Sequence, residues 1–174
     1  MNATEIRAAC ALAAIYILRM LGLFMVMPVL AILALDYQGY TPWLVGLAIG
    51  GYGLTQALLQ IPMGMLSDRI GRKPVIVGGL VCFAIGSVVA GMADSMTWLI
   101  IGRIMQGAGA IAGAVMALAA DVTRESQRTK VMAIIGISIG FSFYLALLLG
   151  PVLSSSYGLS GIFYITALLS VAGI

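Results

Sequence analysis

Charged residues are scarce in this 174-residue sequence, and histidine is absent altogether. Lysine, arginine, aspartate and glutamate together make up 9% of the chain, whereas hydrophobic residues make up 62%. A soluble domain of this length needs far more charge to cover its surface, so a water-soluble class is excluded. The apolar surface must therefore face lipid, and we expect an integral membrane protein.

Groups that could carry out catalysis are missing as well. The only two cysteines, Cys10 and Cys82, lie in or beside apolar runs without the spacing of a metal or redox motif. No nucleophile stands beside a base, and no metal-ligand cluster is visible. An enzyme is therefore the least expected class, and neither a metal site nor a cofactor is predicted.

The nine basic residues outnumber the six acidic ones and leave a net charge of +3. They stand in short clusters between apolar runs or singly within them, and they form no continuous basic face. This placement is typical of membrane topology, so no nucleic-acid partner is predicted.

Apolar runs divide the chain into membrane-spanning helices of about 20 residues each. The first run is too long for a signal peptide, and further runs follow it. The last run is only about 16 residues long, so the sixth helix is expected to be truncated. We predict an all-α membrane protein with five complete helices and a shortened sixth, at residues 9–35, 43–66, 74–93, 97–120, 131–153 and 159–174.

Positive charge is distributed unevenly between the connections. The second and fourth connections contain lysine and arginine, whereas the first, third and fifth (residues 36–42, 94–96 and 154–158) contain neither. Because cytoplasmic loops retain basic residues, the amino terminus is predicted to be cytoplasmic.

Small residues recur at four-residue spacing within the apolar runs. Gly46 with Gly50 and Gly136 with Gly140 are two such pairs. They predict close packing between membrane helices, and a sliding or hinge surface is the alternative.

The segment from Gly64 to Pro74, GMLSDRIGRKP, follows the second apolar run. Asp68 and Arg72 are four residues apart, so a helical continuation would place them on one face as an ion pair. Gly71 permits a tight reversal, and the proline suits the first turn of the next helix. A second interpretation is a basic loop that only sets membrane topology.

This segment resembles the signature loop of the major facilitator superfamily, G-x-x-x-D-R-x-G-R-K, which lies between the second and third helices of that family. The resemblance implies a cytoplasmic latch that stabilises the outward-open state. It implies that Asp68 faces the positive end of a helix dipole in the opposite half, and that Arg72 pairs with Asp121. The residues assigned to this latch are Gly64, Asp68, Arg69, Gly71, Arg72, Lys73 and Asp121.

A second segment, in the fourth apolar run, is similar to the family pattern R-x-x-Q-G-x-G-A. Arg103, Gln106 and Gly107 fall on one helical face. An arginine in a membrane helix costs on the order of 2.5–3.5 kcal/mol to insert, so it usually faces a cavity or a partner. Arg103 could also snorkel to the periplasmic interface. The resemblance implies that these residues couple transport or handle protons, with a structural hydrogen-bond anchor as the alternative.

Other polar residues in the apolar runs are candidates for a substrate cavity. Arg19 is the only charge in the first run, and it can line a cavity or snorkel toward the cytoplasm. Gln56 and Gln60, one turn apart in the second run, can line the cavity or bond neighbouring helices. The first run and the loops together are similar to the drug:proton antiporter branch of the superfamily.

The fifth apolar run keeps only part of the antiporter signature, which ends in G-P-x-x-G-G. Gly150 and Pro151 are present, but serines stand where the final two glycines are expected. We predict that Gly150 and Pro151 bend this helix. The departure from the signature leaves antiport and symport both open.

No carboxylate lies in the middle of an apolar run, because all six acids stand at run ends or in connections. Proton-driven transporters commonly need a titratable group at that depth. Proton coupling is therefore implied by the resemblance alone. Its site would be an interfacial acid such as Asp36 or a group in the second half, or the coupling would differ from the usual scheme.

Together, the residues and the resemblance predict that residues 1–174 form the six-helix amino-terminal bundle of a major facilitator fold, with a 3+3 inverted repeat and without its carboxy-terminal bundle. The resemblance implies a secondary active transporter of the bacterial cytoplasmic membrane that works by alternating access on a small-molecule substrate. Its partners would be the lipid bilayer, the carboxy-terminal half and a proton as the coupling ion. A drug or amphipathic-compound exporter is expected. A sugar or metabolite carrier of the same fold is the alternative, and a non-transporting scaffold is the third class.

Overall fold

The architecture is all-helical in the computed structural model, which describes residues 2–174. Five helical segments in these residues are long and apolar enough to cross a membrane. The elements in chain order are α1 (Ala3–Leu33), the 3-10 turn η1 (Ala34–Asp36), α2 (Pro42–Ile70), α3 (Arg72–Gly91), α4 (Met96–Ala108), α5 (Ala112–Asp121), the 3-10 turn η2 (Glu125–Gln127) and α6 (Arg128–Ala172).

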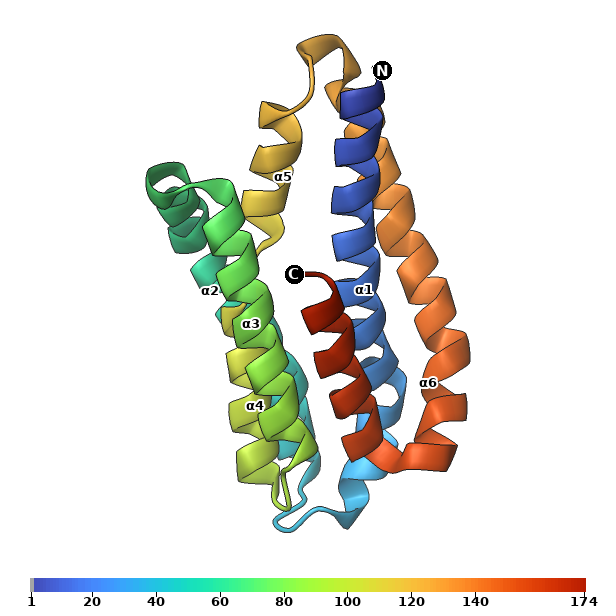
Figure 1. Cartoon of the computed structure of the whole chain (residues 1–174). Helices are drawn as coiled ribbons and strands as arrows, with labels where there is room; N and C mark the ends of the chain where they lie inside the picture. Colours follow the sequence, from blue (N-terminus) through green and yellow to red (C-terminus); the bar gives the residue numbers. More distant parts are fainter. Residues whose placement is uncertain (1) are drawn as a thin grey trace.

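The helices run up and down in one elongated bundle (Figure 1). α1 packs along α6, α3 packs along α4 and α6, and α2 packs on α4. The start of α1, the α2–α3 turn and the α5–α6 connection lie toward the same end of the bundle, uppermost in Figure 1. We call this the basic end, because both of its connections carry arginine.

A capping box sets the start of α1. The Asn2 side chain accepts a hydrogen bond from the Glu5 amide at 2.9 Å, and the Glu5 carboxylate accepts one from the Asn2 amide at 2.8 Å. Two of the free amides at the start of the helix are thereby satisfied. The helix therefore begins at Ala3, six residues before the predicted apolar span, because the cap and not the hydropathy decides where it starts.

Gly71 separates α2 from α3, as the sequence predicts. Its φ of 102° lies in a region that suits glycine, and it ends α2 directly before Arg72 begins α3. α2 continues to Ile70, beyond the predicted limit at residue 66, so Asp68 still lies on that helix. Helical continuation from Asp68 to Arg72 is not found, because the two residues lie on either side of the turn at Gly71, yet they still form the predicted ion pair.

The predicted helix over residues 97–120 is broken into α4 and α5. Residues 109–111 between them are not helical. At the break the Gly109 backbone lies against α3. A Cβ added to Gly109 would lie 3.1 Å from the Phe83 Cβ. Such close contact explains a glycine at this position, but hydropathy alone cannot reveal the interruption, because residues on both sides are apolar.

The predicted helices 131–153 and 159–174 correspond to two arms of α6, residues 128–157 and 159–172. Gly158 separates the arms, with φ 66° and ψ −171°, and the chain reverses direction there (Figure 1). The predicted connection over residues 154–158 is thus largely helical. Gly150 and Pro151 lie inside the first arm, where Gly150 allows close approach to the Met25 carbonyl of α1. The bend assigned to them stays a prediction.

Of the small residues predicted to pack closely, Gly109 does so, as described above, and further close contacts occur at other glycines of α3 and α4. A Cβ on Gly86 of α3 would lie 2.6 Å from the Gln106 nitrogen of α4, and one on Gly102 would lie 2.6 Å from the Ala90 nitrogen. Gly46, Gly50, Gly136 and Gly140 have no such neighbour within 4 Å. Their predicted packing is therefore not found within the described residues, and these small residues lie on open faces of α2 and α6.

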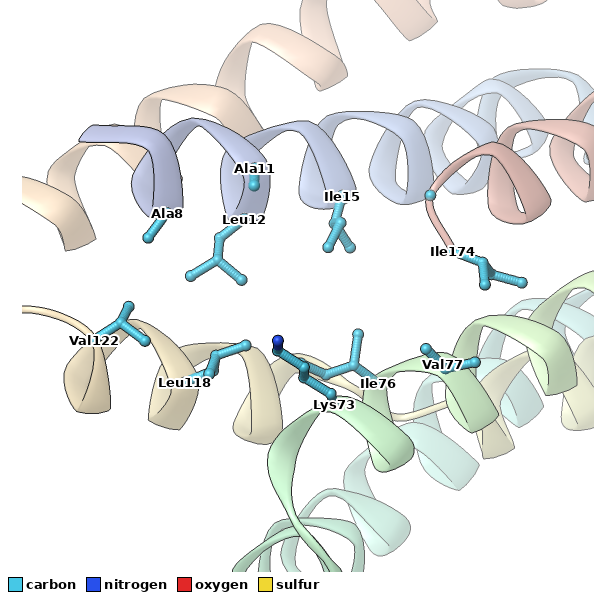
Figure 2. Close-up of a pocket in the computed structure, with 11 residues that line it drawn as sticks. Ala8, Ala11, Leu12, Ile15, Lys73, Ile76, Val77, Leu118, Val122 and Ile174 are labelled. Carbon is cyan, nitrogen blue, oxygen red and sulfur yellow. The ribbon is translucent and has the colours of Figure 1, made fainter. Parts of the chain in front are cut away.

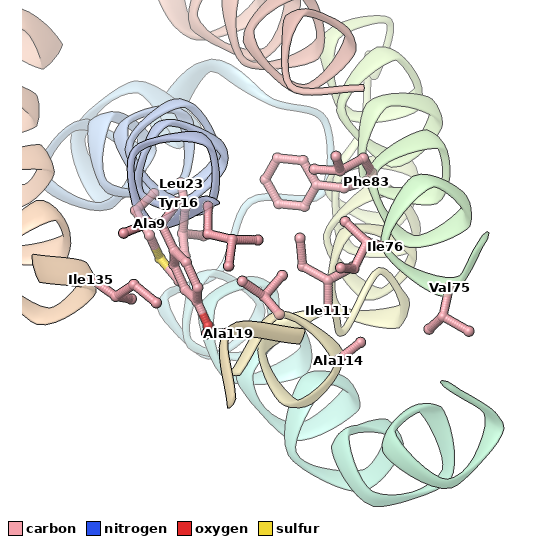
Figure 3. Packing of buried hydrophobic residues seen from close by; sticks show 14 of the residues in the cluster. Ala9, Tyr16, Leu23, Val75, Ile76, Phe83, Ile111, Ala114, Ala119 and Ile135 are labelled. Atoms are coloured by element: carbon pink, nitrogen blue, oxygen red, sulfur yellow. The ribbon is translucent and has the colours of Figure 1, made fainter. Parts of the chain in front are cut away.

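Two groups of buried apolar side chains fill the bundle. One group joins α1 to α3 and α5 in the half nearer the basic end (Figure 3), and the other fills the opposite half. Members of the first group include Leu12, Tyr16, Leu23, Ile76, Phe83, Ile111 and Ala119. The polar sites described next are set into this apolar frame.

Candidate functional site

Arg72 is the centre of a polar cluster at the basic end. Its Nε donates to Asp121 Oδ2 at 3.0 Å, and its Nη1 donates to Ser67 Oγ at 2.7 Å. Nη1 also forms an ion pair with Asp68. Because these partners lie on α2 and α5, one guanidinium at the start of α3 links three helices.

The members of this cluster differ in exposure. The Arg72 side chain is 21% exposed, whereas those of Asp68 and Asp121 are 61% and 55% exposed. Ion pairs that are exposed to this degree are individually weak. Asp68 also keeps an exposed side that can accept a further partner.

Ser67 belongs to this cluster, although the sequence patterns did not single it out. Its buried hydroxyl donates to the Gly64 carbonyl at 2.6 Å and accepts from Arg72. Ser67 could have been predicted from its place next to Asp68 at the end of an apolar run, because a hydroxyl in a membrane helix needs a hydrogen-bond partner. Ser67 thereby joins the predicted Gly64 to the latch residues.

The remaining basic residues of the signature segment do not join the cluster. Arg69 is exposed on the last turn of α2, where a positive charge complements the helix dipole. Lys73 is exposed and lines a cavity of about 400 Å³ (Figure 2). The rest of that lining is apolar and comes from α1, α3, the end of α5 with Val122, and the last two residues of the chain.

Arg103 is 0% exposed and therefore does not snorkel to an interface. Its Nη1 donates to Gln106 Oε1 at 2.7 Å, and Gln106 Nε2 donates in turn to Ser87 Oγ at 2.7 Å. The guanidinium also lies over the Tyr52 ring, 4.7 Å from its centroid. Within residues 2–174, Arg103 has no carboxylate partner, and its Nη2 makes no hydrogen bond.

Arg19 is buried inside the bundle, with 1% of its surface exposed. Its Nη2 donates to the Gly109 carbonyl at 2.8 Å, and its guanidinium lies 5.2 Å from the centroid of the Phe83 ring. The carbonyl freed by the α4–α5 break is thereby satisfied. Neither of the two predicted alternatives, a cavity-lining or a snorkelling arginine, describes this position.

The other predicted residues of the membrane interior are distributed between the elements. Gln56 is half-buried and accepts a hydrogen bond from Tyr52 on the same helix. Gln60 is also half-buried and lies next to Gly113 of α5. Gly107 is buried, and an added Cβ there would lie 3.2 Å from the backbone nitrogen of Gln56, so it allows α4 to pack closely on α2.

A second ion pair at the basic end was missed at the sequence level. Arg124 binds Glu5 through Nε at 2.8 Å and Nη2 at 3.1 Å. The Glu5 carboxylate raises the pKa of the Arg124 guanidinium, which therefore stays charged. The residues lie 119 positions apart, and no local spacing pattern could have paired them.

These sites consist of ion pairs and hydrogen bonds between helices. Within residues 2–174, no group of three or more histidine, cysteine, aspartate or glutamate side chains could hold a metal ion. The arrangement links neighbouring helices.

Comparisons with known proteins agree with this arrangement. The family model described as Major Facilitator Superfamily matches residues 12–174. The inner membrane transport protein YajR of Escherichia coli strain K12 is 54% identical over 174 residues, which are 100% of this chain and 38% of YajR. The multidrug resistance protein MdtH of Aeromonas salmonicida is 36% identical over 124 residues, 68% of this chain and 30% of MdtH. The solved POT family transporter PepTSo has a TM-score of 0.81 at 16% identity, over 96% of this chain and 36% of its own.

Proposed function

The chain belongs to the Major Facilitator Superfamily, whose members are transporters and not enzymes, and from this premise we propose that the complete protein is a secondary active transporter working by alternating access. The chain spans 38% of the length of YajR, so the complete protein contains a second bundle in this proposal. Its substrate would be a drug or another amphipathic compound, exported across the inner membrane in exchange for protons. The name of MdtH and the apolar composition support this substrate class.

The observation that carries the proposal is the placement of Asp68. Its carboxylate pairs with Arg72 yet is 61% exposed. It also ends an exposed apolar stripe on α2, formed by Leu54, Leu58, Ile61 and Met65 at alternating spacings of four and three residues. A bundle packed on this stripe would meet Asp68 at the basic end.

We propose that this meeting is a latch. In the closed state the Asp68 carboxylate would face the amino end of a helix in the second bundle, where the helix dipole favours an anion. Arg72, held by Asp121 and Ser67, would keep Asp68 in place. Gly64, Arg69, Gly71 and Lys73 complete the segment, and Gly71 allows the turn that brings the pair together.

Six membrane crossings and a 3+3 inverted repeat are part of this proposal. The two arms of α6 on either side of Gly158 support two crossings. α4 and α5 run in the same direction, one after the other, and so support one crossing between them (Figure 1). The second arm ends beside the apolar cavity of Figure 2.

Arg103, with Gln106 and Gly107, is the proposed coupling site. Support comes from its burial and from its unpartnered Nη2, since a buried guanidinium without a carboxylate needs another group during the transport cycle. Gln56 and Gln60 remain the candidates for the substrate cavity, because both are half-buried on α2. Gly150 and Pro151 are the proposed bend of the first arm of α6.

The first prediction concerns Asp68→Asn in the complete transporter. Loss of the carboxylate removes a dipole contact of about 1 kcal/mol, which raises the inward-open population roughly fivefold. Drug efflux with and without a protonophore, and labelling of a cysteine placed at Met65 from the cytoplasmic side, measure the effect. Efflux should fall and labelling should accelerate.

Glu125→Gln is the matched control, because Glu125 is an exposed acid at the same end that makes no ion pair within the described residues. Unchanged labelling in Asp68→Asn would refute the latch. Efflux that resists the protonophore would refute proton coupling, and failure to move any amphipathic compound would favour a sugar or metabolite carrier.

A further inference from the structure

One face of α1 carries three buried polar side chains, Glu5, Tyr16 and Arg19. At 100° per residue they lie within about 60° of one another around the helix axis. Each is at most 3% exposed, and the apolar Leu12 and Leu23 continue the same stripe. Three polar groups on one buried helical face need partners on a neighbouring element.

All three partners belong to α5 or to the residues that flank it. Arg19 donates to the Gly109 carbonyl before α5, at 2.8 Å. The Tyr16 hydroxyl donates to the Ala112 carbonyl at the first residue of α5, at 3.3 Å, and Figure 3 shows it directed at this helix. Glu5 pairs with Arg124, three residues beyond the end of α5. α1 therefore holds α5 at both ends.

α5 needs such support because it is short and is not continuous with α4. It has 10 residues, and the non-helical residues 109–111 separate it from the preceding helix. Helices shorter than about 12 residues are marginal without tertiary contacts. Its last residue is Asp121, the acid that binds Arg72.

The Glu5 contact is the most constrained of the three. Its carboxylate is 3% exposed and accepts from Arg124 Nε, Arg124 Nη2, the Arg124 amide and the Asn2 amide, at 2.8, 3.1, 3.2 and 2.8 Å. A buried carboxylate is costly unless it is paired and hydrogen-bonded. Arg124 is thus kept at the start of α1, and the end of α5 is kept with it.

We propose that Glu5, Tyr16 and Arg19 are positioning residues for the latch: they hold α5 against α1 and thereby place Asp121 for Arg72. The inference rests on the latch proposed above and adds the first helix to it. Breaking the Glu5–Arg124 pair would let the end of α5 move, and the Asp121–Arg72 pair would loosen as a result.

The test uses Glu5→Gln in the complete transporter, with Asn2→Ala as the control. Glutamine keeps the capping box but removes the charge that Arg124 needs. Asn2→Ala weakens the start of α1 through the cap and leaves the Glu5 carboxylate and Arg124 in place. A difference between Glu5→Gln and Asn2→Ala therefore reports on the ion pair.

Two measurements are made on each variant. Hydrogen–deuterium exchange reports on α5 directly, and faster exchange in peptides covering Ala112–Asp121 is expected for Glu5→Gln and not for Asn2→Ala. Cytoplasmic labelling of a cysteine at Met65 reports on the latch, and Glu5→Gln should accelerate it about fivefold, a size typical of coupling within one charge network. In an Asp121→Asn background, Glu5→Gln should cause no further acceleration.

The outcomes separate this inference from the proposed function. Unchanged exchange in α5, or full additivity of Glu5→Gln with Asp121→Asn, would overturn the positioning role even if Asp68→Asn opens the latch. Faster exchange in α5 together with an inert Asp68→Asn would support the hold of α1 on α5 while refuting the latch itself.

Discussion

Several buried polar side chains in this bundle are linked in chains of hydrogen bonds. Ser87 shows how such a chain works, because its hydroxyl donates to the Phe83 carbonyl at 2.7 Å and accepts from Gln106 Nε2. Gln106 in turn accepts from Arg103. A membrane interior offers no water to replace a lost partner, so each member depends on the next.

At the scale of the single residue we predict that Ser87→Ala destabilises the bundle by about 1 kcal/mol, because the Gln106 amide loses its acceptor. Ser138→Ala is the matched control. Ser138 also donates to a carbonyl four residues earlier, that of Ile134, but accepts no hydrogen bond from another helix. Thermal unfolding of both variants in detergent measures the difference. Equal unfolding temperatures would show that Gln106 finds another acceptor.

The packing of α3 on α4 depends on glycine at the crossing. Backbone atoms of Gln106 and Gly102 lie 2.6 and 2.8 Å from the position that a Cβ on Gly86 would take. Backbone cannot move aside as a flexible side chain can, so the helices would have to separate. By contrast, Gly78 on the same helix has no such neighbour within 4 Å.

At the scale of the element we therefore predict that Gly86→Ala costs about 1–3 kcal/mol through overpacking. Gly78→Ala should be neutral or stabilising by up to about 1 kcal/mol, since alanine favours the helix. Both variants are compared by their unfolding temperature in detergent. A Gly86→Ala variant as stable as Gly78→Ala would mean that α3 and α4 do not approach as closely as described.

Charge divides the whole molecule into two unlike ends. The basic end holds Arg72 and Arg124 with their ion pairs, while the opposite end joins its loops through backbone hydrogen bonds between Gln38 and residues 94 and 96. The connections at that opposite end contain no lysine or arginine. From the positive-inside rule we predict that the basic end lies in the cytoplasm.

At the scale of the molecule we predict sidedness from labelling. In a variant without Cys10 and Cys82, a cysteine at Gln38 should react with a membrane-impermeant maleimide in intact cells. A cysteine at Ser126 should react only after the cells are opened. Both positions are exposed in connections, so access to each depends on the membrane alone. The reverse pattern would invert the proposed topology.

The helices differ most from their predicted bounds at their ends. Hydropathy located the spans, but Asn2, Gly71 and Gly158 set their limits through a cap and two positive φ angles. The break between α4 and α5 escaped detection because its residues are as apolar as their neighbours. It depends on the approach of Gly109 to α3 and on the Arg19 hydrogen bond.

The amino-acid sequence alone was enough to predict a lipid environment, an all-helical fold and the position of the signature segment. Composition, span length and local spacing can all be read from the chain. The Asp68–Arg72 pair was predictable for the same reason. The tertiary structure decided that Arg19 bonds the carbonyl at the break between α4 and α5, that Ser67 bonds Arg72 and that Glu5 binds Arg124. Apart from the local Ser67 contact, these are pairings between segments far apart in sequence, and only the packed bundle brings such groups within hydrogen-bonding distance.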